Sequence, residues 1–237
     1  MKPSKFKCRA SKAGDLMTNG RAKNSIGQTC ISMLKEWLIT DLTGKTKDIS
    51  SKYLTHGIVT EDLAIQRISK YYGQIFTKNE MQLENEYFTG TFDACSDVLV
   101  VDAKSSFSPF SFPYFDAEPP KGYYNQVQVY LDLTGLKKGA VAFCLENGTE
   151  EEIEKLAWQI AKREAIEKGI EDFEMEIEHW NQANEQLNYD HLPEWMRIKV
   201  YEFDRNEELI QQMKDRVVDC REIIENELLT ELMNIKF

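Results

Sequence analysis

The sequence has no long hydrophobic run. No apolar stretch in its 237 residues approaches the length of about eighteen residues that a membrane-spanning helix needs, so we expect no membrane span. The N-terminal residues are basic, but no hydrophobic segment follows them, so we do not expect a secretory signal. With 42% hydrophobic residues, the chain can form one substantial core, or one core and an appendage.

Clustered cysteines and histidines are also missing. The five cysteines are an odd number and stand singly, at Cys8, Cys30, Cys95, Cys144 and Cys220. Such a pattern is typical of reduced thiols in a cytoplasmic protein and argues against a zinc or iron–sulfur site. The three histidines, His56, His179 and His191, do not have the spacing of metal ligands either. We therefore expect a cytoplasmic protein without a metal site built from cysteine or histidine.

The net charge of −11 is unfavourable for a nucleic-acid-binding protein, but the charges are unevenly distributed. Residues 1–52 contain eleven Lys and Arg against four Asp and Glu, whereas residues 150–237 contain eleven against twenty-four. Because binding depends on the local field along a surface, a basic N-terminal part on an acidic body can still bind DNA. The acidic C-terminal part can equally be a plain solvated surface.

The segment 90–106, GTFDACSDVLVVDAKSS, combines the pattern of a buried strand with charged residues. Its apolar run ends in Asp102-Ala103-Lys104, and alternate side chains of a strand share a face, so Asp102 and Lys104 are predicted side by side. Asp93, on the preceding turn or strand, can approach them. Two carboxylates and an ammonium suit Mg²⁺ next to a phosphate. Because a D-x-K triplet is common by chance, a strand end that enters a solvated turn is the alternative.

A glutamate is predicted on the apolar stripe of a helix over residues 50–73, which Gly73 ends. A glutamate that faces the core is costly unless it is paired or bound to a cation. The alternative is that this glutamate, Glu61, lies at the edge of the stripe and reaches water. The stripe consists of Leu54, Ile58, Glu61, Ile65, Ile68 and Tyr72, in steps of four and three residues.

Other helices and strands are predicted around this segment. Helical spacing and caps predict helices over residues 25–40, 123–135, 149–187 and 205–235, and alternation or apolar runs predict strands over 81–88, 139–145 and 197–203. The aromatic and proline-rich segment 105–122 is predicted as a loop that contacts bases or covers an edge of the core. A stripe of Phe173, Ile177 and Trp180 is predicted to pack on the body or on another subunit. This order of elements predicts one α/β domain with appended helices.

Six residues occur in an order that resembles a known nuclease superfamily. A glutamate on a helix is followed by G-x-x-D, by D-x-K, and by Q-x-x-x-Y on the next helix, where residues four apart share a face. This order resembles the PD-(D/E)XK nucleases and, more narrowly, the YqaJ-type viral recombinase nucleases. The matching residues are Glu61, Asp93, Asp102, Lys104, Gln126 and Tyr130.

The N-terminal segment carries a further resemblance to this family. Its R-x-S-x-x-G pattern at Arg9, Ser11 and Gly14 looks like the family's N-terminal motif, and the likeness covers residues 7 to 147. Phe92 stands where the superfamily usually has proline, and the acid of the D-x-K triplet is Asp102 where many relatives have glutamate. The long acidic segment after residue 150 has no counterpart in this pattern of motifs.

The resemblance implies a restriction-endonuclease-like α/β core, a central mixed sheet flanked by helices, with appended C-terminal helices. It implies a single nuclease domain over residues 1–237, with a helical insertion or extension at about 150–192. It further implies 5′-to-3′ digestion of one strand of linear double-stranded DNA for phage-type recombination, with Mg²⁺ as cofactor and Mn²⁺ as a substitute. The implied partners are double-stranded DNA ends, a single-strand annealing protein and further copies of the chain in a ring trimer, in the cytoplasm of a bacterial host.

The resemblance also implies catalytic roles. Lys104 would position the attacking water, and Gln126 and Tyr130 would hold the lysine or the DNA backbone. One or two metal ions would be held by Glu61, Asp93, Asp102 and the backbone carbonyl of Ala103.

A pocket for a terminal 5′-phosphate is a further expectation, because an exonuclease must recognise an end. A terminal phosphate carries more charge than an internal one, so it requires a positive pocket rich in hydrogen-bond donors. The candidate residues are Arg9, Ser11, Ser105 and Gln126. The alternative is that Ser11 only caps its helix and Arg9 only adds to a basic surface; Lys5 or Lys7 could also replace the arginine.

Two other functions are compatible with the pattern. An endonuclease or end-resecting relative, such as the CRISPR-adaptation nucleases, is the first, but those enzymes carry an iron–sulfur cysteine cluster that this sequence lacks. A non-catalytic DNA-binding or assembly module on the same fold is the second. A degraded site is typical of such a module, whereas every acidic position and the lysine are intact here.

Overall fold

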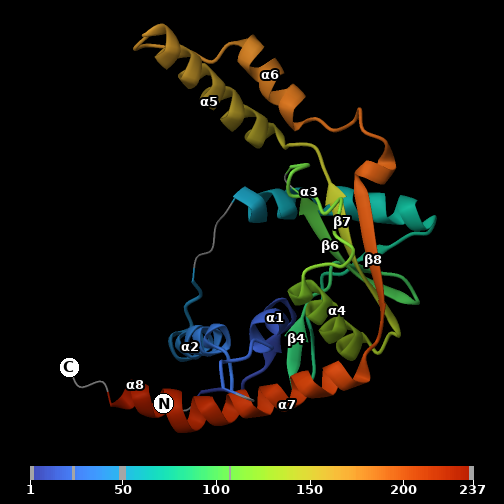
Figure 1. The fold of residues 1–237 in the computed structure, drawn as a ribbon, viewed down its shortest axis with the longest axis vertical. Coiled ribbons are helices and arrows are strands. Elements are labelled where there is room, and N and C mark those ends of the chain that lie inside the picture. Colours follow the sequence, from blue (N-terminus) through green and yellow to red (C-terminus); the bar gives the residue numbers. More distant parts are fainter. Residues whose placement is uncertain (1–2, 23–24, 48–51, 107, 235–237) are drawn as a thin grey trace.

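A mixed five-stranded sheet forms the centre of the fold (Figure 1). The computed structural model describes residues 3–22, 25–47, 52–106 and 108–234, with the backbone alone for residues 52–54. The strands, in their order across the sheet, are β2 (Thr77–Lys78), β5 (Ala94–Cys95), β6 (Leu99–Ser106), β7 (Lys138–Leu145) and β8 (Ile198–Asp204). The central pair β6 and β7 is parallel and the other pairs are antiparallel, which confirms the predicted mixed sheet.

The two central strands are apolar on both faces because a helix covers each face. Ile68 of α3 shares a buried cluster with Val101 on one face of β6. Val127 of α4 shares another with Val100 on the opposite face. Parallel strands buried in this way are typically near-continuous hydrophobic runs. Strand β7 is such a run, and β6 is one from Leu99 to Val101, before Asp102. The two helices are α3 (Lys52–Tyr72) and α4 (Lys121–Thr134).

A second, three-stranded sheet joins the N-terminal segment to the chain that precedes the central strand. Its strands, in their order across the sheet, are β1 (Cys8–Arg9), β4 (Phe88–Gly90) and β3 (Leu83–Glu84). The single strand predicted over residues 81–88 is wrong, because Asn85 turns the chain between β3 and β4. Its side-chain oxygen accepts hydrogen bonds from the backbone N–H groups of Tyr87 (2.9 Å) and Phe88 (2.9 Å).

The N-terminal turn packs closely on α4. It consists of a short 3₁₀ helix, η1 (Ala10–Lys12), and α1 (Ala13–Leu16). A Cβ atom at Gly14 would lie 2.9 Å from the Cα atom of Gly122, so the glycine lets the two backbones approach. Gly14 thereby holds the N-terminal segment against the helix that carries Gln126 and Tyr130.

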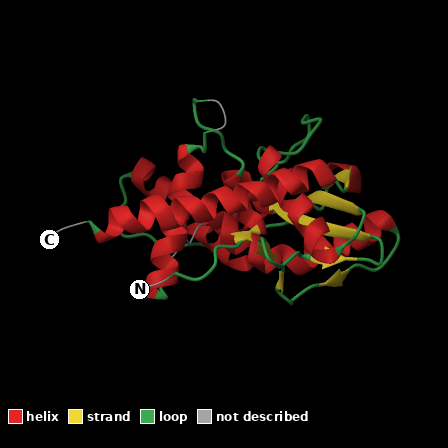
Figure 2. Ribbon diagram, turned by 90° about the horizontal axis from the view of Figure 1, so that it is seen from below, coloured by secondary structure: helices red, strands yellow, loops and turns green. Residues whose placement is uncertain are grey.

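Helix α2 (Gln28–Thr43) and the C-terminal helices cover the side of the body that contains both chain ends (Figure 1). The C-terminal elements are α7 (Glu207–Ile223), a π-helical turn (Ile224–Leu228) and α8 (Leu229–Met233). Figure 2 shows helices and connecting loops at this end of the molecule, with the strands at the other end. Across the helices that the structure describes, none has the length and apolar character needed to cross a membrane.

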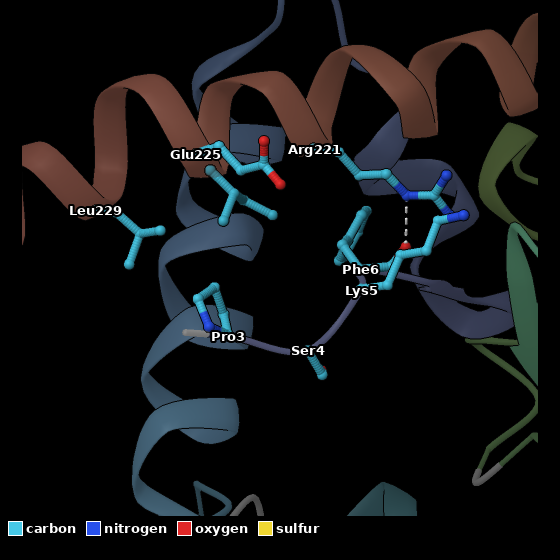
Figure 3. Close-up of a pocket in the computed structure, with 8 residues that line it drawn as sticks. Pro3, Ser4, Lys5, Phe6, Arg221, Glu225 and Leu229 are labelled. Atoms are coloured by element: carbon cyan, nitrogen blue, oxygen red, sulfur yellow. Dashed lines mark hydrogen bonds between the residues drawn. The ribbon is translucent and has the colours of Figure 1, made fainter. Parts of the chain in front are cut away.

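The N-terminal residues lie beside α7, as Figure 3 shows. The Nε group of Arg221 donates a hydrogen bond to the carbonyl of Phe6 (3.0 Å). The cavity between the two segments has a volume of about 480 Å³, and Glu225 supplies its one carboxylate. It shares no lining residue with the cavity of the candidate site described below.

The acidic segment forms an arm of two paired helices rather than one long helix (Figure 1). The first helix begins with the predicted capping box of Thr149 and Glu152. It ends at Gly169, whose φ of 67° is left-handed, so the prediction of a continuous helix to residue 187 is wrong. The two helices are α5 (Glu150–Lys168) and α6 (Ile177–Leu187).

The predicted stripe on this segment is also wrong, because the chain turns back between the two helices. Phe173 lies in the connection, where its ring centroid is 6.3 Å from that of Trp158. Ile177 is exposed, and Trp180 is half-buried against the other residues of the arm. The arm therefore packs on itself. Its buried cluster consists of Ile153, Ala157, Ile160, Ala183 and Leu187.

A buried carboxylate at the end of β7 ties the base of the arm to the body. Glu146 accepts hydrogen bonds from Nε (2.7 Å) and Nη2 (2.9 Å) of Arg67 on α3. The Nη2 atom of Arg197 lies 3.6 Å from the same carboxylate, and Arg197 also contacts Asp190 at 2.7 Å. Both Glu146 and Arg197 are almost completely buried. The carboxylate thus offsets the charge of two arginines from separate parts of the chain.

We expect Glu146→Ala to lower the free energy of unfolding by about 3–5 kcal/mol, because it leaves two largely buried guanidinium groups without this carboxylate. Guanidinium chloride unfolding followed by circular dichroism measures the change. The exposed Glu154→Ala on α5 is the matched control and should stay within about 0.5 kcal/mol of the parent. Equal stabilities of the two variants would contradict a structural role for Glu146.

Candidate active site

Asp102 and Lys104 lie side by side near the end of β6, as strand alternation predicts. The Nζ atom of Lys104 is 2.8 Å from Oδ2 of Asp102, and Asp102 is 1% exposed. The other carboxylate oxygen, Oδ1, accepts a hydrogen bond from Nε2 of Gln126 (2.9 Å). The ammonium group also lies 4.9 Å from the ring centroid of Tyr123. Asp102 is therefore held between a lysine of its own strand and a glutamine of α4.

Gln126 and Tyr130, one turn apart on α4, connect Asp102 to the chain before Asp93. Gln126 Nε2 donates to the hydroxyl oxygen of Tyr130 (2.8 Å), and this hydroxyl donates to the carbonyl of Thr91 (3.0 Å). Burial raises the pKa of the Tyr130 hydroxyl and the charge of Asp102 raises it further, so the group stays a donor. Gln126 thus contacts Asp102 and not Lys104, while the alternative contact of Gln126 and Tyr130 with the DNA backbone stays a prediction.

Asp93 is the second carboxylate beside the strand. Its Oδ2 atom accepts a hydrogen bond from the backbone N–H of Ala103 (2.6 Å), between Asp102 and Lys104 in the sequence. Burial and, after it, the charge of Asp102 raise the pKa of Asp93 to about 7, against the opposing effect of Lys104. Burial also raises the pKa of Asp102. The one ammonium group therefore does not fully offset the two carboxylates, and the site favours additional positive charge.

An open cavity of about 530 Å³ brings these groups together with α3. Ser105 lies in its wall, and its hydroxyl accepts a hydrogen bond from Oγ1 of Thr60 (2.8 Å). Asp102 is not part of the wall, since it is buried behind it. The polar and aromatic lining residues that we use below are Glu61, Asp93, Lys104, Ser105, Ser111 and Tyr123, together with Ala103.

Glu61 reaches this cavity from α3. The predicted stripe is right for Ile65, Ile68 and Tyr72, which pack on the core, and wrong for Ile58. Ile58, which the stripe placed inside, is 64% exposed and lines the cavity with Glu61. The glutamate lies at the edge of the buried face, where its Oε1 atom is 3.6 Å from Nζ of Lys78. The side chain of Leu54 is outside the residues described. The buried face of α3 consists of His56, Thr60, Ala64, Ile65 and Ile68, because the helix crosses the sheet along a row of four-residue steps.

The oxygen atoms at the cavity fit a hard divalent cation, which prefers carboxylate and carbonyl ligands. Oδ2 of Asp102 accepts no hydrogen bond of good geometry and has only the ion pair with Lys104, so it has spare capacity to accept. Within the ranges that the structure describes, no three His, Cys, Asp or Glu side chains are already gathered as a metal-binding cluster. Binding of a cation therefore requires Glu61, Asp93 and Asp102 to draw closer together.

Arg9 does not line this cavity. It lies on β1 and lines a separate cavity of about 180 Å³, together with Lys7 and Lys12. Its charge nevertheless lowers the pKa of Tyr130, against the larger effect of burial, so Arg9 is within electrostatic range of the site. The basic residues of the N-terminal motif thus flank the candidate site without forming its wall.

Ser11 is exposed in η1 and also lies outside the cavity wall. It caps no helix, because Arg9 is the N-cap of η1 and Lys12 that of α1. Of the four residues predicted to bind a terminal phosphate, Ser105 lines the cavity and Gln126 lies behind it. The pocket that the sequence predicts is therefore divided between the cavity and the N-terminal turn.

Sequence reasoning assigned no role to three residues at the site. Tyr123 faces Lys104, and its spacing of three residues from Gln126 placed it on the same face of the helix. Thr60 fixes Ser105, and Lys78 approaches Glu61. Neither has a local signal, because both contacts depend on how α3 and β2 pack against the central sheet.

The arrangement of helices and strands matches solved structures of exonucleases. A phage-related exonuclease from Haemophilus somnus 129PT matches with a TM-score of 0.76 and 24% identity, over 97% of this chain and 97% of that chain. An alkaline exonuclease from Laribacter hongkongensis matches with a TM-score of 0.64 and 16% identity, over 97% and 95% of the two chains. Its complex with dAMP matches with a TM-score of 0.62 and 18% identity, over 96% and 91%.

The chain therefore has the fold of phage-related and alkaline exonucleases, which confirms the fold expected from the family resemblance. The matches extend over nearly the whole chain, so the likeness includes the helical arm as well as the central sheet. No protein-family model and no curated protein matches the sequence. At these identities the likeness establishes the fold, and the chemistry rests on the residues of the site.

Proposed function

We propose that the protein is a metal-dependent deoxyribonuclease that digests one strand of linear double-stranded DNA from an end, 5′-to-3′. The observation that carries this proposal is the pair Asp93 and Asp102, joined through the backbone of Ala103. Asp93 and Lys104 line one open cavity, and Asp102 lies directly behind its wall. Two carboxylates with raised pKa values beside one ammonium form a site that favours a cation and a phosphate. The shared exonuclease fold supports the same function.

Glu61, Asp93, Asp102 and the carbonyl of Ala103 are the groups proposed to hold Mg²⁺, for which Mn²⁺ can substitute. When bound, such an ion polarises the phosphate and lowers the pKa of an attached water. The chain's own part is positional: Gln126 fixes the orientation of Asp102 through its hydrogen bond to Oδ1.

Lys104 is proposed to orient the attacking water, since its ammonium group is fixed between Asp102 and the ring of Tyr123. The hydroxyl of Tyr130 accepts a hydrogen bond from Gln126 and donates one to the carbonyl of Thr91. These two bonds connect the chain just before Asp93 to the helix that contacts Asp102. These contacts leave a polar, partly charged wall against which a phosphodiester can be placed.

Recognition of a DNA end is proposed to depend on the groups around the cavity. Ser105 lines it, Gln126 lies behind it, and Arg9 contributes positive charge from the N-terminal turn. Ser11 is exposed on that turn and can donate a hydrogen bond to a phosphate that extends beyond the cavity. We propose that these four residues favour a terminal 5′-phosphate over a 5′-hydroxyl group.

The proposed setting is phage-type recombination in the cytoplasm of a bacterial host, with a single-strand annealing protein as partner and a ring-shaped homotrimer as the assembly. The description of one structural neighbour as a phage-related exonuclease supports this setting.

A digestion time course on labelled linear DNA tests the function. With Mg²⁺, a label at the 5′ terminus should be released by the first cuts, while 3′-labelled strands shorten progressively and closed circular DNA stays intact. EDTA should stop digestion. Linear DNA with 5′-phosphate ends should be digested faster than DNA with 5′-hydroxyl ends, and an Arg9→Ala/Ser11→Ala variant should lose this preference while it retains slow cleavage.

Each alternative has its own outcome. Absence of Mg²⁺-dependent cleavage by a folded protein that binds DNA would identify a non-catalytic module. Cleavage of closed circles at the rate of linear DNA would identify an endonuclease. Early release of the 3′ label would reverse the polarity while leaving the nuclease assignment intact.

A further inference from the structure

Two phenylalanines of the loop between β6 and α4 are completely exposed. Phe110 is 100% exposed and Phe115 is 99% exposed. A single exposed apolar side chain is ordinary on a protein surface, so exposure alone indicates nothing. The contacts around the two residues distinguish two interpretations. Either the loop is loosely attached and its rings are exposed by chance, or the loop is fixed and holds a ring in a position where a ligand can contact it.

The loop is fixed to the body by hydrogen bonds. The exposure of its two phenylalanines is therefore not the result of a loosely attached segment. Nζ of Lys199 on β8 donates to the carbonyls of Pro113 (2.7 Å), Tyr114 (3.2 Å) and Asp116 (2.6 Å). The hydroxyl of Tyr201 donates to the carbonyl of Asp116 as well (2.9 Å).

Two further aromatic residues of the loop, Phe112 and Tyr114, anchor it to the body. Phe112 is 5% exposed, and its ring centroid lies 4.6 Å from that of Tyr114. The hydroxyl of Tyr114 donates to the carbonyl of Met196 (3.0 Å). Thus the loop both covers an edge of the core, through Phe112 and Tyr114, and presents other aromatic rings to the outside.

Phe110 stands at the rim of the candidate active site. The chain turns from Ser108 to Ser111, whose backbone N–H (3.1 Å) and hydroxyl (2.9 Å) both donate to the carbonyl of Ser108. Ser111 lines the cavity that contains Asp93 and Lys104. Consecutive Cα atoms are about 3.8 Å apart, so Phe110 projects from the position directly beside the cavity wall.

We propose that Phe110 is a stacking platform for a nucleobase of the DNA strand whose phosphate enters the cavity. This inference rests on the proposed function. A nucleotide has an apolar base next to a charged phosphate, and the chain carries a fully exposed phenylalanine one residue before Ser111, which lines a cavity with phosphate-binding chemistry. An aromatic ring stacks on any base, so the platform would position DNA without sequence preference.

Phe115 is the internal comparison. It is as exposed as Phe110, but neither of its neighbours, Tyr114 and Asp116, lines the cavity. The two residues therefore separate a general effect of removing an exposed ring from an effect specific to the rim of the site.

Binding of DNA in Ca²⁺, used in place of Mg²⁺ to limit cleavage, tests the platform. The ligand is a linear duplex with a 5′-phosphate and with 2-aminopurine at the 5′-terminal position, whose fluorescence reports stacking. We expect Phe110→Ala to weaken binding about 10- to 100-fold and to abolish the change in 2-aminopurine fluorescence. Phe110→Trp should retain both, Phe110→Leu should resemble Phe110→Ala, and Phe115→Ala should resemble the parent.

A second ligand removes the base instead of the ring. Replacing the 5′-terminal nucleotide by an abasic one should weaken binding of the parent but leave binding of Phe110→Ala unchanged, because the two changes remove the same contact. Additive effects of the two changes would overturn the proposal. The proposal would also be overturned if the Phe110→Ala variant bound DNA as tightly as the parent and showed the same change in 2-aminopurine fluorescence.

These outcomes differ from failure of the proposed function. If the parent digests linear DNA and Phe110→Ala binds as the parent does, the platform is wrong and the nuclease stands. If the parent binds DNA with a Phe110-dependent fluorescence change but never cleaves it with Mg²⁺, the nuclease proposal fails and the stacking contact stands. If the parent does not bind DNA at all, both the nuclease proposal and the stacking proposal fail.

Discussion

Asp102→Asn is expected to reduce turnover of linear DNA by at least about 10²-fold, while DNA binding persists. The substitution preserves the shape of the side chain, and the amide oxygen can still accept the hydrogen bond from Gln126. It removes the charge that the proposed metal ion requires, and it leaves Lys104 without the carboxylate 2.8 Å away. Steady-state digestion with Mg²⁺ and DNA binding with Ca²⁺ measure the two effects separately.

The control for this substitution is Asp97→Asn. Asp97 is an exposed aspartate on the turn just before β6, and it does not line the cavity, so its amide variant should digest DNA like the parent. Near-parental turnover of Asp102→Asn would remove Asp102 from the catalytic site. Equal losses in both variants would indicate a general effect of charge near the strand.

Lys104→Ala is expected to lower kcat by about 10²-fold or more with little change in the binding of DNA. Lys104 lies at the wall of the cavity and its ammonium group is held by Asp102 and Tyr123, so its loss removes a positioned donor from the site. Lys104→Arg should not restore full activity, because the planar guanidinium group cannot occupy the position of a compact ammonium group.

The same change has a structural consequence that must be measured. Removing one partner of a buried ion pair leaves Asp102 without its counter-charge, so thermal unfolding should be recorded beside the kinetics. Lys138→Ala is the control, since Lys138 is exposed at the start of the neighbouring strand β7. If Lys104→Ala changes only the dissociation constant for DNA, the lysine is a phosphate contact and does not act on the water.

Local patterns predicted the three long strands of the central sheet, β6, β7 and β8. Alternation along β6 placed Asp102 and Lys104 on one face, and Gly73 and Gly135 end α3 and α4 with positive φ angles of 64° and 75°. These features depend on neighbours in the chain, which is why a single sequence is enough to find them. The start of α5 at Thr149 could be predicted for the same reason, since its capping box involves residues only three apart.

Errors arose where the signal was local but ambiguous. The acidic segment reads as one helix because its charged residues continue past Gly169, although a glycine after Lys168 is a typical helix end. The stripe on α3 was assigned from spacing alone, and Ile58 fits such a stripe while it faces the open cavity. The prediction that Glu61 belongs to the site does not depend on the whole stripe, because Glu61 lies at its edge and lines the cavity.

Contacts between distant segments outside the family motif could not be predicted. Glu146 meets Arg67 and Arg197 only after β7, α3 and the start of β8 have come together. The hydrogen bond between Thr60 and Ser105 depends in the same way on how α3 packs on the sheet. No spacing in the sequence encodes such pairs.

The helical arm has the connectivity of an enlarged hairpin loop. It joins β7 and β8, which are antiparallel neighbours, and its two ends meet at the base. There the N–H of Gly148 donates to the carbonyl of Leu187 (2.8 Å), and the N–H of Tyr189 donates to Oδ1 of Asn147 (2.9 Å). The chain thus leaves and re-enters the body at almost one point, where evolution can lengthen, trim or exchange the connection without shifting the register of either strand. Selection on the size of the arm is thereby separated from selection on the carboxylates of the central strand.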